Sequence, residues 1–400
     1  MEINTARIID YWLGIPLCFL FSLIRRLEMI IFGGSLHKMP PAKVMFIGFS
    51  EMGSIILGYS AIKRIKDRYP GVKLYFWTFK GNSDVVDILE IIPPANIFTV
   101  RNENLCLMFA DIVRNLRRIR KENIDVAIDF ELFSRFSSIL GYLSAAKIKV
   151  GFNRYKMEGL YRGDLHTHKV IYNSYLHISK NFIALAESAM LYSADPPLLR
   201  QSADGVECIV PKITVQEKEI DAIWTKLRQE NPLINKNSKI IVIRFDFDDK
   251  VSVRAWPRSY YLSLIKKILA KDNVYVVLIS VKPTDIPKTL DYQRCINLTG
   301  KTTVRDLVCL FNIANVLMGH DGGTLHIASL SNIYIIALFG PESPLLYAPL
   351  TEKTEIFYKR FYCSPCLSAY NNRNTTCNDN RCMQAITVDE VYTEMLKIIS

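Results

Sequence analysis

An α/β fold with two Rossmann-like domains is the architecture that this sequence predicts. From Lys43 onward, short apolar runs alternate with longer amphipathic stretches, a pattern typical of parallel sheets covered by helices on both faces. The series begins again after about residue 205. In addition, the chain has 400 residues, of which 50% are hydrophobic and 22% charged. That is too long for one ordinary core and indicates two packed domains.

The first expected element is an apolar helix near the N-terminus. The fourteen residues between Asp10 and Arg25 are uncharged. As a helix they cover about 21 Å, which is short of the roughly 30 Å hydrocarbon core of a bilayer. Trp12 is typical of a membrane interface, and Arg25 and Arg26 would face anionic headgroups. We therefore expect residues 1–38 to be a membrane-associating helix and linker; a helix that packs on the protein, forms a dimer seam or spans the membrane is the alternative.

Two domains follow this segment. The first is predicted over residues 39–205 and the second over residues 206–400. In the first domain we expect a helix over 54–69 and strands at 44–49, 73–78, 125–129 and 147–150. In the second we expect strands at 239–244, 274–279, 315–318 and 334–339, and a helix over 258–271.

The most informative stretch follows the predicted strand 315–318 and reads Gly319-His-Asp-Gly-Gly-Thr-Leu-His326. Its glycines allow the backbone to approach a ligand closely, while Asp321, Thr324 and His326 supply an acceptor, a hydroxyl and an imidazole. A strand, a glycine turn and a helix N-terminus form an anion site because unpaired N–H groups point at the ligand. We expect phosphate there. A tight strand-to-helix connection with Asp321 as the helix cap is the alternative.

Residues 315–344 resemble the donor-binding region of the heptosyltransferase family, glycosyltransferase family nine. Members carry an Asp-[Ser/Thr]-Gly-x-x-His turn, a helix, and a strand that ends in Leu-Phe-Gly-Pro. In this sequence the Ser/Thr position is Gly322, which removes one hydroxyl. The stretch Arg254-Ala-Trp-Pro257 is similar to the family's [Lys/Arg]-x-Trp-Pro motif, in which the basic residue meets the donor pyrophosphate.

The resemblance implies a GT-B fold, in which the sheets of two Rossmann-like domains face a central cleft. It also implies a single inverting displacement that needs no catalytic metal; a magnesium ion at Asp246-x-Asp248 is the alternative. The donor-binding residues that it implies are Arg254, Asp321, Gly322, Gly323, Thr324 and His326.

The first domain departs from the family where the general base should be. In the family, a Gly-Asp turn after the first strand supplies the aspartate that activates the acceptor hydroxyl. Here the turn reads Gly53-Ser54, and a serine cannot accept that proton without a base of its own. Glu51 lies three residues upstream on the same loop and could supply the carboxylate. A helix cap or a solvent-facing side chain is the alternative for Glu51.

The stretch from 151 to 169 mixes basic and aromatic residues after a predicted strand. We expect Arg154 and Arg162 to contact an anionic acceptor and the aromatic rings to stack on sugar faces. A solvated basic loop is the alternative.

The four C-terminal cysteines form a separate motif, Cys363-x-x-Cys366 followed after ten residues by Cys377-x4-Cys382. Four thiolates in a short loop-rich segment could hold one structural zinc ion. Two disulfides or free thiols are the alternatives. No cleavable secretion signal is recognisable, so a reducing cytosol is expected and disulfides are disfavoured.

The formal net charge of +11 indicates an anionic partner. We find no DNA-binding zinc-finger spacing and no repeat, so nucleic acid is not expected. We therefore predict a cytoplasmic glycosyltransferase, peripheral on the inner face of the cell membrane. It would transfer a sugar such as heptose from a nucleoside-diphosphate donor to a lipid-linked or surface-glycan acceptor, with no required cofactor. The alternatives are a catalytically inactive sugar-nucleotide-binding subunit and a membrane-surface scaffold.

Overall fold

The computed structural model describes residues 3–32, 40–153, 160–191, 199–246, 252–285 and 294–399. The chain divides into two compact units, Met1–Ile209 and Val210–Ser400, and each unit is described by itself below.

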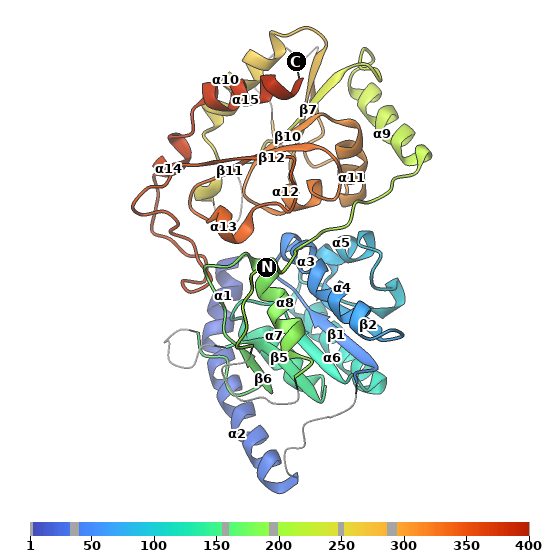
Figure 1. The fold of residues 1–400 in the computed structure, drawn as a ribbon, viewed down its shortest axis with the longest axis vertical. Coiled ribbons are helices and arrows are strands. Elements are labelled where there is room, and N and C mark those ends of the chain that lie inside the picture. Colours follow the sequence, from blue (N-terminus) through green and yellow to red (C-terminus); the bar gives the residue numbers. More distant parts are fainter. Residues whose placement is uncertain are drawn as a thin grey trace. The chain divides into compact units, whose positions relative to one another are not determined.

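Unit 1 contains a six-stranded parallel sheet in the order β3-β2-β1-β4-β5-β6 (Figure 1). Its strands are β1 (Lys43–Ile47), β2 (Lys73–Phe79), β3 (Ile97–Val100), β4 (Val126–Asp129), β5 (Ile148–Phe152) and β6 (His168–Val170). Its helices after the N-terminal segment are α3 (Met52–Leu57), α4 (Tyr59–Arg68), α5 (Ser83–Ile88), α6 (Leu105–Glu122), α7 (Arg135–Leu143) and α8 (Ile178–Ser188). β1 lies near the centre of the sheet. The chain adds β2 and β3 on one side of β1 and then β4, β5 and β6 on the other side, so the order of strand addition reverses between β1 and β4.

Helices cover both faces of this sheet because successive side chains of a strand point to opposite sides. Met45 of β1 belongs to the buried cluster that includes Ile119 of α6. Its neighbour Phe46 lies against Phe130, which stacks on Phe182 of α8. The continuous apolar sequence of the central strands is therefore explained by burial on two sides, as predicted.

Unit 2 contains a second six-stranded parallel sheet, in the order β12-β11-β10-β7-β8-β9. Its strands are β7 (Lys239–Arg244), β8 (Val274–Ile279), β9 (Cys295–Asn297), β10 (Val316–His320), β11 (Tyr334–Phe339) and β12 (Thr354–Tyr358). Its helices are α9 (Glu217–Glu230), α10 (Arg258–Leu269), α11 (Val304–Ile313), α12 (Gly323–Ala328), α13 (Pro344–Tyr347), α14 (Arg381–Gln384) and α15 (Val388–Ile399). Ile241 and Ile243 of β7 pack with Ile265 of α10 and Met395 of α15 in one buried core. The predicted α/β class with two Rossmann-like sheets is confirmed.

The helix expected over 54–69 is instead two helices, α3 and α4, which meet at Gly58. A Cβ built on Gly58 would lie 2.5 Å from the ring of Phe130. The glycine is therefore needed where these helices press on the end of β4.

The N-terminal segment also forms two helices, α1 (Ile3–Trp12) and α2 (Gly14–Phe32). They pack on α7 within unit 1. Asp10 accepts hydrogen bonds from the backbone N–H groups of Arg135 and Phe136, at 3.0 and 2.9 Å, and so caps α7. Arg25 pairs with Asp164 at 3.2 Å, so the prediction that Arg25 faces headgroups is wrong, whereas the Arg26 side chain is 67% exposed.

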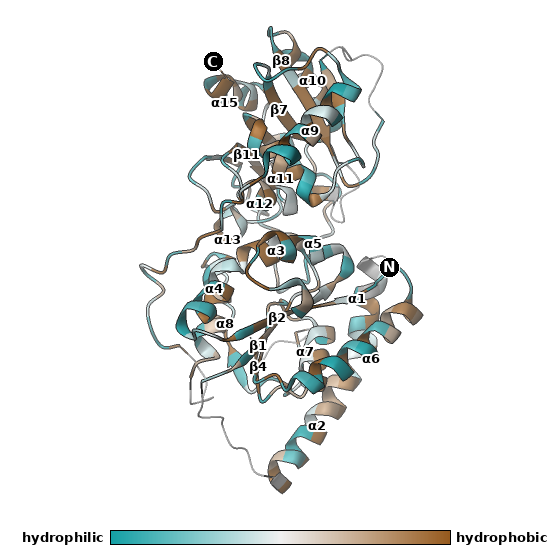
Figure 2. Cartoon of the chain, turned by 90° about the vertical axis from the view of Figure 1, so that its right-hand side faces the viewer, coloured by the Kyte–Doolittle hydropathy of each residue, from teal (hydrophilic) through white to brown (hydrophobic). Residues whose placement is uncertain are grey.

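The outward face of α2 is apolar. The Arg7–Ile31 stretch is 25 residues long, and its 18-residue apolar window has a mean hydropathy of 1.6 and is 17% buried. By length and composition this stretch could cross a membrane. One such helix is weak evidence for a membrane span, because core helices of soluble proteins and signal sequences have the same length and composition. Figure 2 shows the hydrophobic residues along α2. The exposed ones include Phe19, Leu20, Leu23, Leu27, Ile30 and Ile31.

Candidate functional site

In unit 2, the predicted glycine turn lies at the carboxyl edge of the sheet. β10 ends at His320, and Asp321 and Gly322 connect it to α12. β10 pairs with β11 on one side and with β7 on the other. Because β7 is the first strand of this sheet, the turn stands at the topological switch point, where open α/β sheets bind their ligands.

Arg254 reaches this turn from a short 3₁₀ helix, Ser252–Arg254. Its Nε lies 3.5 Å from Oδ2 of Asp321, and its Nη2 lies 3.2 Å from Oε2 of Glu342. The three side chains are 8%, 8% and 1% exposed. Arg373 also approaches Glu342, at 3.8 Å. The structure thus brings together two predicted donor residues, Arg254 and Asp321, and adds a buried carboxylate.

Sequence reasoning missed Glu342 and a second arginine, Arg244. Arg244 is the last residue of β7, and its Nη1 donates to the carbonyl oxygens of His320 and Asp321, both at 3.3 Å. Its Nη2 lies 3.6 Å from Asp246. The sequence did offer a signal for each. Arg244 is an arginine at the end of an apolar strand, and Glu342 is an acidic residue directly after the Gly-Pro that follows the apolar strand β11.

The remaining predicted donor residues occupy the turn and the start of α12. Gly322, Gly323 and Thr324 are partly exposed, and His326 is 4% exposed. A Cβ built on Gly322 would lie 2.1 Å from Nη1 of Arg244. The surface of the turn therefore consists of glycine backbone, one hydroxyl and two nearby guanidinium groups, a set suited to phosphate oxygens.

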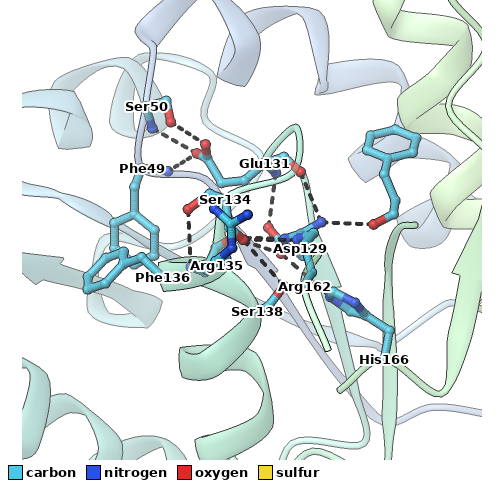
Figure 3. A network of polar contacts seen from close by, with 12 residues as sticks. Phe49, Ser50, Asp129, Glu131, Ser134, Arg135, Phe136, Ser138, Arg162 and His166 are labelled. Atoms are coloured by element: carbon cyan, nitrogen blue, oxygen red, sulfur yellow. Dashed lines mark hydrogen bonds and ion pairs between the residues drawn. The ribbon is translucent and has the colours of Figure 1, made fainter. Parts of the chain in front are cut away.

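In unit 1, the loop after β1 is held by a buried carboxylate that was also missed (Figure 3). Oε1 of Glu131 accepts hydrogen bonds from the backbone N–H groups of Phe49 and Ser50, at 2.5 and 2.7 Å. Its Oε2 accepts one from the Ser50 hydroxyl. Burial raises the pKa of the Glu131 carboxyl. Since Glu131 follows β4 by two residues, it links the carboxyl ends of the two strands at the switch point of this sheet.

Glu51, the predicted base, is the next residue of that loop. It is half-buried and directly precedes α3, yet its side chain makes no capping hydrogen bond to this helix. The helix-cap alternative is therefore not what the structure shows. Ser54 lies in the first turn of α3 and is also half-buried.

Arg162 lies inside unit 1 and not on its surface, with its side chain 1% exposed. It donates to the carbonyl oxygens of Ser134 and Phe152, at 2.9 and 3.0 Å, and pairs with Asp129 (Figure 3). Direct contact of Arg162 with an acceptor therefore gains no support from its position. Arg154, the other predicted acceptor residue, lies outside the described residues.

His166 completes this buried network. Its Nε2 lies 3.6 Å from Oδ2 of Asp129. Burial is the main reason why the pKa of His166 is lowered to about 4, while the Asp129 carboxylate acts in the opposite direction. Burial would raise the pKa of Asp129, but the charge of Arg162 and the neighbouring His166 bring it below its ordinary value.

The four C-terminal cysteines are all free thiols: Cys363 is exposed, Cys366 and Cys377 are partly exposed, and Cys382 is buried. The pKa of the Cys382 thiol is raised to about 11, mainly by burial, and the other three cysteines contribute to this rise. Among the described residues, no group of three or more His, Cys, Asp or Glu side chains is arranged to hold a metal ion.

Comparisons with known proteins agree with the fold and the motifs. The family model of glycosyltransferase family 9 (heptosyltransferase) matches residues 112–376, which is more than half of the chain. A lipooligosaccharide heptosyltransferase 2 from Haemophilus influenzae is 25% identical over 162 residues, 38% of this chain and 46% of that protein. One from Haemophilus ducreyi is 21% identical over 324 residues, 78% of this chain and 88% of that protein.

Among solved structures, the Escherichia coli ADP-heptose lipopolysaccharide heptosyltransferase II matches with a TM-score of 0.66 and 17% identity. The match covers 89% of this chain and 98% of that one. At this identity the likeness shows the fold. Together with the family model it establishes a GT-B-type glycosyltransferase and disfavours the scaffold alternatives. The chain belongs to glycosyltransferase family 9, the heptosyltransferase family.

Proposed function

We propose that this glycosyltransferase transfers a heptose from a nucleoside diphosphate to a lipopolysaccharide-type or other lipid-linked glycan acceptor. The names of its relatives support the sugar and the acceptor class. The observation that carries the proposal is the cluster of Arg254 with Asp321 and Glu342 at the switch point of unit 2.

The donor site would work through charge. A nucleoside diphosphate leaves with negative charge on its terminal phosphate, and a desolvated guanidinium stabilises that charge as it develops. Arg254 would take this role, while the backbone of Gly322 and Gly323 and the hydroxyl of Thr324 would bind phosphate oxygens. Arginine can thereby supply the positive charge that other glycosyltransferases take from a divalent metal.

The acceptor hydroxyl would be activated by Glu51. In one inverting displacement, the acceptor oxygen forms a bond to the anomeric carbon while the bond from that carbon to the diphosphate oxygen breaks. The hydroxyl proton passes to the Glu51 carboxylate, a step that Ser54 cannot perform. Glu131 would act as a positioning residue, because it binds the backbone of the same loop.

We also propose that α1 and α2 hold unit 1 on the inner face of the cell membrane. The exposed apolar residues of α2 would enter the headgroup region, and the exposed Arg26 would meet anionic lipid. Binding to vesicles that contain phosphatidylglycerol, compared with neutral vesicles, tests this placement.

A structural zinc ion at Cys363, Cys366, Cys377 and Cys382 remains part of the proposal. Its support is the spacing of these cysteines in the sequence, Cys363-x-x-Cys366 followed by Cys377-x4-Cys382. Elemental analysis of protein purified without added metal should find about one zinc per chain, and Cys363→Ser with Cys366→Ser should lose it. Less than a tenth of an equivalent in the wild type would contradict the zinc site.

The function is tested by transfer from ADP-heptose, and from UDP- and GDP-sugars as controls, to glycolipid extracted from cells that lack this protein. We expect transfer from ADP-heptose, a fall in kcat of about 100- to 10,000-fold in Glu51→Gln, and a loss of donor binding in Arg254→Ala. Ser54→Ala is the matched control and should retain kcat. A Glu51→Gln variant as active as the wild type would refute the role of Glu51, and no transfer from any donor by folded protein would refute the function.

A further inference from the structure

Arg244 is a buried arginine to which the two donor motifs assign no role. Its side chain is 9% exposed at the carboxyl end of β7. Its Nη1 is directed at the backbone of the turn before α12, through the carbonyl oxygens of His320 and Asp321. Its Nη2 lies on the side of Asp246, at 3.6 Å. Nη1 of the guanidinium is thus anchored on the turn, and Nη2 faces the Asp246 carboxylate.

Gly322 is the residue that makes room for this guanidinium. A Cβ at position 322 would lie 2.1 Å from Nη1 and 3.1 Å from Cζ of Arg244. Real Cβ atoms essentially never come within 3.0 Å of such a neighbour. A side chain at 322 and the observed position of Arg244 therefore exclude each other. The resembled motif has a Ser or Thr hydroxyl at position 322. In this protein Gly322 has no side chain, and the Arg244 guanidinium occupies that space.

A second guanidinium approaches the same turn, since Nε of Arg254 lies 3.5 Å from Asp321. The ion pairs that these two arginines make with the described carboxylates of Asp246, Asp321 and Glu342 measure 3.2 to 3.6 Å. Strong charge-assisted hydrogen bonds are shorter, about 2.7–2.9 Å. Phosphate oxygens can therefore become closer partners of these guanidinium groups than the carboxylates are, and the shielding from water strengthens such contacts.

We propose that Arg244 is a second diphosphate-binding residue of the donor site, which takes the place of the hydroxyl absent at Gly322. The inference rests on the proposed function and deepens it. The ligand class is the diphosphate of a nucleoside-diphosphate sugar, bound between Arg244 and Arg254. In the free protein, Asp246 occupies the position that a phosphate oxygen takes on binding.

The experiment measures ADP and adenosine affinity by isothermal titration calorimetry. The double variant Arg244→Ala with Asp246→Asn removes both charges, so that no buried carboxylate is left unpaired. We expect about 10- to 100-fold weaker ADP binding, as for the loss of one hydrogen bond to a charged group, and unchanged adenosine binding. Arg244→Lys keeps the charge but not the planar fork and should give an intermediate loss.

Position 322 supplies a second, independent test. Gly322→Ser alone should weaken ADP binding, because its side chain displaces the guanidinium. Adding Arg244→Ala to Gly322→Ser should restore part of the affinity, because the serine hydroxyl then has room to bind phosphate. Circular dichroism and melting temperature check that each variant is folded.

Two results separate the inference from the function beneath it. If the wild type binds ADP, and the Arg244→Ala/Asp246→Asn and Arg244→Lys variants bind it equally well, the inference is overturned while the proposed donor site stands. The inference is likewise overturned if Gly322→Ser binds ADP as tightly as the wild type does. If the folded wild type binds none of ADP, UDP and GDP, the proposed donor site fails, and the inference fails with it.

Discussion

Acid should destabilise unit 1 through His166. This imidazole is 3% exposed, and a pKa of about 4 keeps it neutral in the folded protein down to that pH. In the unfolded chain its pKa is about 6.5. Between pH 6.5 and pH 4 the unfolded state therefore binds one proton that the folded state does not. The free energy of unfolding falls as the pH is lowered through this window.

The size of the effect follows from the two pKa values. A difference of about 2.5 pH units at about 1.4 kcal/mol per unit gives about 3 kcal/mol between pH 6.5 and pH 4. Glu131 acts in the opposite direction, because its raised pKa gives stability at low pH that is lost as the pH rises through its folded pKa. A comparison with His166→Gln isolates the histidine.

The assay is urea unfolding at pH 4.5, 5.5 and 6.5, followed by hydrogen exchange of β1 and β4 peptides so that unit 1 is observed by itself. The wild type should lose about 2 kcal/mol more than His166→Gln between pH 6.5 and pH 4.5. Equal pH slopes in the two proteins would refute the argument. So would an NMR titration that places the His166 pKa near 6.5.

Three further predictions concern the same structure. Glu131→Gln should keep the conformation of the loop after β1, because an amide oxygen can accept the two backbone hydrogen bonds. Glu131→Ala leaves both N–H donors unpaired, which should lower the free energy of unfolding in urea by about 1–3 kcal/mol for each donor. Glu131→Ala should also lower kcat. A Glu131→Ala protein with wild-type stability would contradict this. Gly151→Ala should cost about 1–3 kcal/mol, because its Cβ would lie 2.4 Å from Nε2 of His166; an unchanged melting temperature would show that the site relaxes freely. Ile30→Glu with Leu23→Glu should abolish sedimentation with phosphatidylglycerol vesicles and leave ADP binding intact, and undiminished sedimentation would exclude α2 as the contact.

The central strands were predictable because a strand buried on both faces is a continuous apolar run. The expected strands 239–244, 274–279 and 334–339 match β7, β8 and β11 residue for residue. The strands missed were short or near an edge of the sheet. β6 is only His168–Val170, and β12 is partly exposed throughout. The apolar sequence of β6 and β12 is too short or too interrupted to distinguish these strands from loops.

The candidate site was predictable only where a local motif existed. The motifs named Arg254 and Asp321, and the structure places these side chains together. The local signals for Arg244 and Glu342, an arginine at the end of an apolar strand and an acidic residue after Gly340-Pro341, do not show that these residues join the site, because their contacts are made between residues far apart in sequence. The alternation of basic and aromatic residues around Arg162 could not reveal that this arginine turns inward to Asp129.

The two buried arginines that the motifs highlighted differ in what holds them, and this difference separates a structural role from a binding role. Arg162 pairs with the Asp129 carboxylate, but it also donates to the backbone carbonyl oxygens of Ser134 and Phe152 at 2.9 and 3.0 Å. A ligand could bind the Arg162 guanidinium only if these backbone hydrogen bonds were broken. Arg254 is held by carboxylate side chains at 3.2 and 3.5 Å, which a diphosphate can replace without disturbing a strand or a helix. Burial alone ranks the two arginines alike, whereas the backbone acceptors of Arg162 favour a structural role and the side-chain acceptors of Arg254 support its proposed contact with the donor.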